Sequence, residues 1–115
     1  MNTQQTWATI IGIILLLVGV LGFVMSSPLL GLFGVNATHN IVHLLTGAIF
    51  LWAGLSSSAP TKATNKWLGV IYIVVAIVGF LGFLSFLEVM GGMDLDNWLH
   101  LVIGVVSVLI GWMAN

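Results

Sequence analysis

The stretch Thr38–Gly47, THNIVHLLTG, has a close counterpart in Leu95–Gly104, LDNWLHLVIG. Both copies contain the pattern Asn-x-x-His-Leu-x-x-Gly, and each copy stands at the start of a long apolar segment. A polar pair at two matching places in an otherwise apolar chain indicates that the chain is built from two related units. The two copies therefore predict two matching helical units, each with a polar start to one of its helices.

The composition of the chain is typical of a membrane protein. Of 115 residues, 60% are hydrophobic and only 4% are charged, whereas a soluble domain carries about a quarter charged residues. Cysteine is absent, which excludes disulfides, thiolate metal sites and thiol catalysis. Lys62 and Lys66 are the only lysine or arginine residues, and nucleic-acid binding needs a larger basic surface.

Four apolar segments predict four transmembrane helices, each of which needs about 20 residues. None of them alternates with a period of two, as a membrane β-strand would. Tryptophans lie near the segment ends, as in the aromatic belts of membrane proteins. The first segment lacks the basic start of a signal peptide, so we expect it to be retained. The expected spans are approximately Trp7–Met25, Asn40–Leu55, Trp67–Leu87 and Asn97–Met113.

The expected fold is an all-α membrane protein with one domain over residues 1–115, in which repeat 1 covers about 7–55 and repeat 2 about 67–113. The two motifs match at a shift of 57 positions. In the preceding helices, GVLGF at 19–23 aligns with GFLGF at 79–83, a shift of 60 that implies a shorter first joint in the second repeat. Because each helix-loop-helix unit has two spans, both units insert the same way up. The repeats are therefore parallel, with a pseudo-two-fold axis along the membrane normal.

Helical spacing places the matching residues of each motif on one face. At about 100° per residue, Asn40, His43 and Gly47 share a narrow stripe, and the second motif repeats it. Glycines on such a stripe let helices approach closely, and its polar side chains then face protein and not lipid. We expect the second and fourth helices to meet near the axis, with His43 facing His100. The glycines expected at helix contacts are Gly19, Gly47, Gly54, Gly79, Gly104 and Gly111.

One interpretation of the polar residues is a structural network of Asn40, His43, Asn97 and His100. Each Asn would satisfy backbone amides at a helix start, and each His would form a hydrogen bond between the units. The protein would then be a non-enzymatic structural or accessory module without a cofactor. It would lie in the lipid bilayer alone, as a homo-oligomer or as part of a larger membrane complex.

The alternative interpretation is a metal site near the same helix starts. His39 and His43 are spaced i, i+4, which places both imidazoles on one helix face, and Asp96 and His100 repeat this spacing. Three imidazoles and one carboxylate suit zinc, iron, copper or manganese. A related alternative makes His43 and His100 the axial ligands of one b-type haem.

Transport and catalysis have less support. No acidic or basic residue lies in the middle of an expected span, where coupled transporters place one. No nucleophile–His–acid set and no pair of acids lies at membrane depth. We therefore expect no enzymatic activity.

The orientation follows from Lys62 and Lys66, which both lie in the middle joint. Basic residues mark the cytoplasmic side of a membrane. With four spans, both termini should then be cytoplasmic, and the two polar motifs should lie near the outer face.

The segments GLFGVNATHNIVHLLTG at 31–47 and DNWLHLVIG at 96–104 resemble an uncharacterised bacterial family of small four-helix membrane proteins, known only as a domain of unknown function. The resemblance covers nearly the whole chain. It implies four spans in the bacterial inner membrane. It implies no activity, cofactor or partner.

Overall fold

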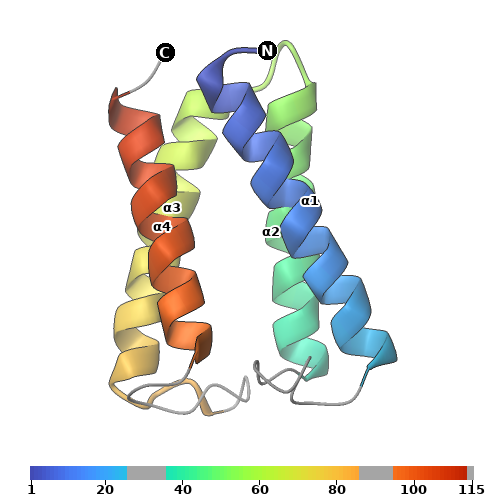
Figure 1. Cartoon of the computed structure of the whole chain (residues 1–115), viewed down its shortest axis with the longest axis vertical. Helices are drawn as coiled ribbons and strands as arrows, with labels where there is room; N and C mark the ends of the chain where they lie inside the picture. The colour runs from blue at the N-terminus through green and yellow to red at the C-terminus, as the bar shows by residue number, and fades with distance from the viewer. Residues whose placement is uncertain (26–35, 86–94, 114–115) are drawn as a thin grey trace.

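The computed structural model describes residues 1–25, 36–85 and 95–113, and these residues form four helices (Figure 1). Each helix is long and apolar enough to cross a membrane, and no described residue lies in a strand. The expected all-α class with four spans is confirmed. The helices are α1 (Thr3–Val24), α2 (Ala37–Leu55), α3 (Thr61–Phe80) and α4 (Leu95–Met113).

The four helices form two antiparallel hairpins, one of α1 and α2 and one of α3 and α4. Contacts are far denser within each hairpin than between the two. Figure 1 shows the start of α1, the end of α4 and the α2–α3 turn at one end of the molecule, which we call the terminal end. The first turns of α2 and α4 lie at the opposite end.

Glycines allow the close packing inside each hairpin. A Cβ added to Gly47 would lie 3.0 Å from the carbonyl oxygen of Gly12, and one added to Gly104 would lie 2.9 Å from that of Gly69. Backbone therefore meets backbone at both crossings, as in other membrane helix pairs with small residues at the contact. The other expected glycines also face the hairpin partner: Gly19 lies against Leu44, Gly54 against Thr9, Gly79 against Asn97, and Gly111 against Lys66.

The contacts of the first hairpin recur 57 positions later in the second. Gly22 lies against the Asn40 side chain, and Gly79 lies against Asn97. By these contacts Gly79 takes the place of Gly22, whereas the predicted shift of 60 paired it with Gly19. In the sequence, GVLGF at 19–23 also resembles AIVGF at 76–80, which is a shift of 57.

The expectation that α2 and α4 meet along an axis is wrong, because these two helices make the weakest contact of any pair. The glycines that permit close approach face the hairpin partner and not the other hairpin. Only longer side chains can therefore reach from α2 to α4.

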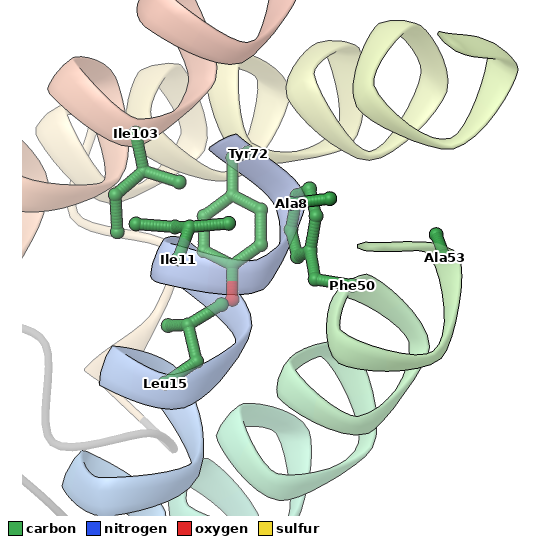
Figure 2. Close-up of a cluster of buried hydrophobic side chains, with 7 residues drawn as sticks. All are labelled: Ala8, Ile11, Leu15, Phe50, Ala53, Tyr72 and Ile103. Atoms are coloured by element: carbon green, nitrogen blue, oxygen red, sulfur yellow. The ribbon is translucent and has the colours of Figure 1, made fainter. Parts of the chain in front are cut away.

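A cluster of seven buried hydrophobic residues fills the space between the hairpins (Figure 2). Its members come from all four helices. Tyr72 of α3 is the one member whose side chain carries a polar group. The Tyr72 hydroxyl lies 2.8 Å from the Thr46 hydroxyl of α2, which makes a hydrogen bond between the hairpins. The cluster consists of Ala8, Ile11, Leu15, Phe50, Ala53, Tyr72 and Ile103.

Local sequence explains where the helices begin. At α1, the Asn2 side chain accepts a hydrogen bond from the Gln5 amide, and the Gln5 side chain accepts one from the Asn2 amide, which is a capping box. At α2, the Asn36 side chain accepts the His39 amide at 2.9 Å. Asn36 therefore caps α2, and the expectation that Asn40 serves the helix start is wrong, since Asn40 lies a turn further in.

The end of α3 differs from the expected span, which continued to Leu87. The helix ends at Phe80, because Gly82 adopts a φ of 85°, a left-handed conformation that favours glycine. The Gly82 amide donates to the Gly79 carbonyl and the Phe83 amide donates to the Val78 carbonyl. This pair of hydrogen bonds is a Schellman motif, which satisfies the last carbonyls of the helix.

Candidate metal centre

Three histidines converge at the end of the bundle opposite the termini. His39 and His43 lie one turn apart on α2, and His100 lies in the second turn of α4. The exposed fractions of the three side chains are 1%, 2% and 2%, respectively. One ring nitrogen from each can be chosen so that all three lie within 4.8 Å of one another.

The rings form a compact triangle that joins the two hairpins. The centroid of the His43 ring lies 4.3 Å from that of His39 and 6.1 Å from that of His100. The centroids of His39 and His100 lie 5.8 Å apart. The three rings thus surround a small common space, to which α2 supplies two ligands and α4 supplies one.

Asp96, the fourth predicted metal ligand, is buried one turn before His100 in the first turn of α4. A carboxylate at that position interacts favourably with the positive end of the helix dipole. The group of metal-ligating atoms that converge includes the three histidines but not Asp96. The structure therefore brings together three of the four residues that the sequence suggested.

The two asparagines of the predicted network, Asn40 and Asn97, point away from the three histidines. Asn40 lies against Gly22 of α1, and Asn97 lies against Gly79 of α3. Both asparagines are buried inside their own hairpins. Each Asn side chain thus lies against a glycine of its own hairpin partner, and the network of two Asn and two His between the units stays a prediction.

His43 occupies the least satisfied position in the site. Among the described residues, neither of its ring nitrogens has a hydrogen-bond partner. The hydrogen bond predicted between His43 and the facing unit is therefore not formed with any described residue of that unit. Burying a polar group without a partner costs about 1–3 kcal/mol.

A cavity of about 280 Å³ adjoins the three histidines between α2 and α3. The surface that it exposes is almost wholly carbon. Thr46 and Tyr72, which are hydrogen-bonded to each other, also line it. Neither residue was predicted to belong to the site, and neither is a defined position of a sequence motif.

A second polar cluster, which sequence reasoning also missed, holds the hairpins together at the terminal end. The Asn65 side-chain amide donates to the Gln4 side-chain oxygen at 2.8 Å, and the Gln4 amide donates to the Ile110 carbonyl at 2.6 Å. The Trp7 indole N–H donates to the Ser107 hydroxyl at 2.8 Å. We call these five residues the terminal clamp.

Residues 5–113 match the family described as a domain of unknown function, DUF4383. The chain belongs to this family, as the resemblance of its paired motifs implied. Neither the curated proteins nor the solved structures contain a match. The chain is thus a small four-helix membrane protein from a family described as a domain of unknown function.

Proposed function

We propose that this family member binds one transition-metal ion between its hairpins, with His39, His43 and His100 as ligands. The convergence of three buried imidazoles carries the proposal, because their ligand atoms lie within 4.8 Å of one another. Nitrogens that share a zinc ion, at about 2.0–2.1 Å each, are at most about 4.2 Å apart. Side-chain adjustments of less than about 1 Å would therefore complete the site.

The donor atoms restrict the kind of ion. Neutral imidazole suits zinc, copper, iron and nickel, whereas magnesium and calcium take oxygen ligands. The three nitrogens come from side chains that are nearly inaccessible to solvent. A zinc-like ion held by three protein ligands keeps a further position for another ligand.

A purely structural histidine cluster accounts less well for the same geometry. Hydrogen bonds would have to satisfy each buried imidazole, yet His43 has none with a described residue. A bound ion takes one of its nitrogens and offsets part of the cost of burial. The observation thus favours metal binding over the network of asparagine and histidine side chains.

The geometry also favours a single ion over a haem. A haem held by His43 and His100 would need its macrocycle to pass between their rings. The His39 ring lies beside that space, with its centroid 4.3 Å from that of His43 and 5.8 Å from that of His100. It would collide with the macrocycle.

The proposed ion has a structural consequence, because its ligands come from both hairpins. The terminal clamp joins the hairpins at one end, and the ion would join them at the other. We infer a small non-enzymatic membrane module of two hairpins, related by a pseudo-two-fold axis along the membrane normal. The contacts that recur at a constant spacing of 57 positions support this relationship.

The position of Lys62 and Lys66 supports an orientation for the site. Both lie in the first two turns of α3, at the end where the termini lie. Basic residues favour the cytoplasmic side. In a bacterial inner membrane, both termini would then be cytoplasmic, and the metal site would lie in the outer leaflet.

Metal analysis of the purified protein tests the proposal. The chain is expressed in medium supplemented with zinc, purified in detergent and analysed by inductively coupled plasma mass spectrometry. We expect one ion per chain, lost in His43→Ala and in His100→Ala. Asn65→Ala is the matched control, because it removes a buried polar contact between the hairpins at the opposite end and should keep the ion. Equal metal contents in wild type and both histidine variants would contradict the proposal.

A further inference from the structure

Each hairpin is a rigid unit, because its two helices pack backbone against backbone. Gly47 of α2 lies against the Gly12 carbonyl of α1, and Gly104 of α4 lies against the Gly69 carbonyl of α3. Contacts between the hairpins are far sparser than those within them. Closely packed contacts resist gradual deformation, so a movement in this molecule takes place between the hairpins and leaves each of them intact.

The hairpins are joined firmly at the terminal end. The turn between Leu55 and Thr61 is the covalent link between them, and the Thr61 hydroxyl donates to the Ala53 carbonyl at 2.6 Å across this turn. The hydrogen bonds of the terminal clamp also run from one hairpin to the other. The buried hydrophobic cluster extends along α1 only to Leu15 and along α2 only from Phe50, so it occupies the terminal half and the middle of the molecule.

The opposite end, which we call the histidine end, is joined differently. Among the described residues, no side chain of α1 beyond Leu15 is buried. Leu84, a buried apolar residue past the end of α3, packs against α3 of its own hairpin. The histidine rings do reach across, with the centroids of His39 and His100 at 5.8 Å. The joining of the hairpins at this end therefore depends on what the three imidazoles bind.

For an ion to bind, the histidine end must open. The exposed fractions of the three side chains are 2% or less, so an ion in solution cannot reach the ring nitrogens while the hairpins lie as in Figure 1. Because α2 supplies His39 and His43 and α4 supplies His100, moving α4 away from α2 uncovers all three. The weak contact between these two helices offers little resistance to such a movement.

Resting on the proposed metal site, we infer that the hairpins swing apart about the terminal end and that a bound transition-metal ion closes them. The open form offers the ion two ligands on one helix, because His39 and His43 lie one turn apart with ring centroids at 4.3 Å. Closure adds His100 as the third ligand. A ligand shifts a conformational equilibrium by its difference in affinity for the two forms, and the third imidazole supplies that difference. The chain thus converts the binding of an ion into a change in the distance between its hairpins.

Distances between spin labels measure this movement directly. The chain contains no cysteine, so a pair of introduced cysteines takes nitroxide labels without other changes. Ile41 of α2 and Val102 of α4 are exposed positions in different hairpins, each two residues from a histidine. Double electron–electron resonance is recorded on Ile41→Cys/Val102→Cys in phosphatidylcholine nanodiscs, after treatment with a chelator and after addition of zinc. We expect a longer, broader distance distribution without zinc and a shorter, narrower one with it.

A second label pair is the matched control. Leu55→Cys/Leu109→Cys also joins exposed positions in different hairpins, but near the terminal end. Its distance distribution should be the same with and without zinc, and it shows that each variant remains folded. In His100→Ala, the Ile41–Val102 pair should keep the long, broad distribution when zinc is added.

Metal analysis of the same samples separates this inference from the metal proposal. Absence of zinc in the wild type would overturn both. Bound zinc that leaves the Ile41–Val102 distribution unchanged would overturn the hinge and leave the metal site standing. An equal shift at both label pairs, or a full shift in His100→Ala, would also overturn the hinge. A shift confined to the Ile41–Val102 pair and lost in His100→Ala would establish it.

Discussion

The ring centroids of His43 on α2 and His100 on α4 lie 6.1 Å apart, although the two helices that carry them make the weakest contact in the molecule. Glycines let each helix lie close to its hairpin partner, and only longer side chains span the space between the hairpins. The relative position of the hairpins therefore depends on the buried hydrophobic cluster between them and on a few polar side chains at each end. The three histidines are the group at the end opposite the termini.

Enlarging Gly47 should destabilise the first hairpin. A Cβ at this position would lie 2.9 Å from the Leu16 amide nitrogen and 3.0 Å from the Gly12 carbonyl oxygen, so backbone would have to move. Gly47→Leu should lower the free energy of unfolding by about 1–3 kcal/mol, as overpacking does. Denaturation in mixed micelles measures the change.

The matched control for this prediction is Ala48→Leu. Ala48 is the next residue along α2 and is exposed, so the added side chain faces lipid and not α1. Unfolding midpoints that fall equally in the two variants would show that the close helix contact is not the cause.

Tyr72 and Thr46 should be energetically coupled. Their hydroxyl groups form a hydrogen bond between the hairpins, and such bonds between membrane helices contribute about 0.6–2 kcal/mol. Tyr72→Phe and Thr46→Val should each lower stability, and the double variant should lose less than the sum, because both single changes remove the same bond. Strict additivity in a double-mutant cycle would count against this hydrogen bond.

Cysteine labelling should place the α2–α3 turn in the cytoplasm. A cysteine introduced at Ser57, in this turn, should react with a membrane-impermeant maleimide only after the cells are opened. A cysteine at Thr38, exposed in the first turn of α2 at the opposite end, should react in spheroplasts. Reversed labelling of the two positions would show that Lys62 and Lys66 face outside.

Much of the fold could be predicted from the sequence, because span length and apolar composition largely determine the helices. The spacing of Asn40, His43 and Gly47 also placed three residues correctly on buried positions of α2. The end of α3 could not be placed, since it depends on the left-handed conformation of Gly82. Nothing in the apolar pattern of this segment distinguishes a helix that continues from one that stops.

The site was harder to predict, because it depends on how the hairpins pack against each other. Helical spacing shows which residues share a face, but it does not show which neighbour that face meets. Asn40 and His43 share a stripe on α2, yet Asn40 lies against α1 and His43 points toward His100. The roles of Gln4 and Asn65 were likewise invisible, since each is a single polar residue whose partner lies on a different helix.

X-ray absorption at the zinc edge tests the metal proposal most directly, because it reports the ligands of the ion itself. In the zinc-loaded protein we expect a first shell of nitrogen or oxygen atoms at about 2.0–2.1 Å, with the outer-shell scattering of three imidazole rings. His100→Ala should reduce that scattering or release the ion, whereas Asn65→Ala should leave the spectrum unchanged. A shell of oxygen atoms without imidazole scattering, or a spectrum that His39→Ala, His43→Ala and His100→Ala all leave unchanged, would contradict the proposed site.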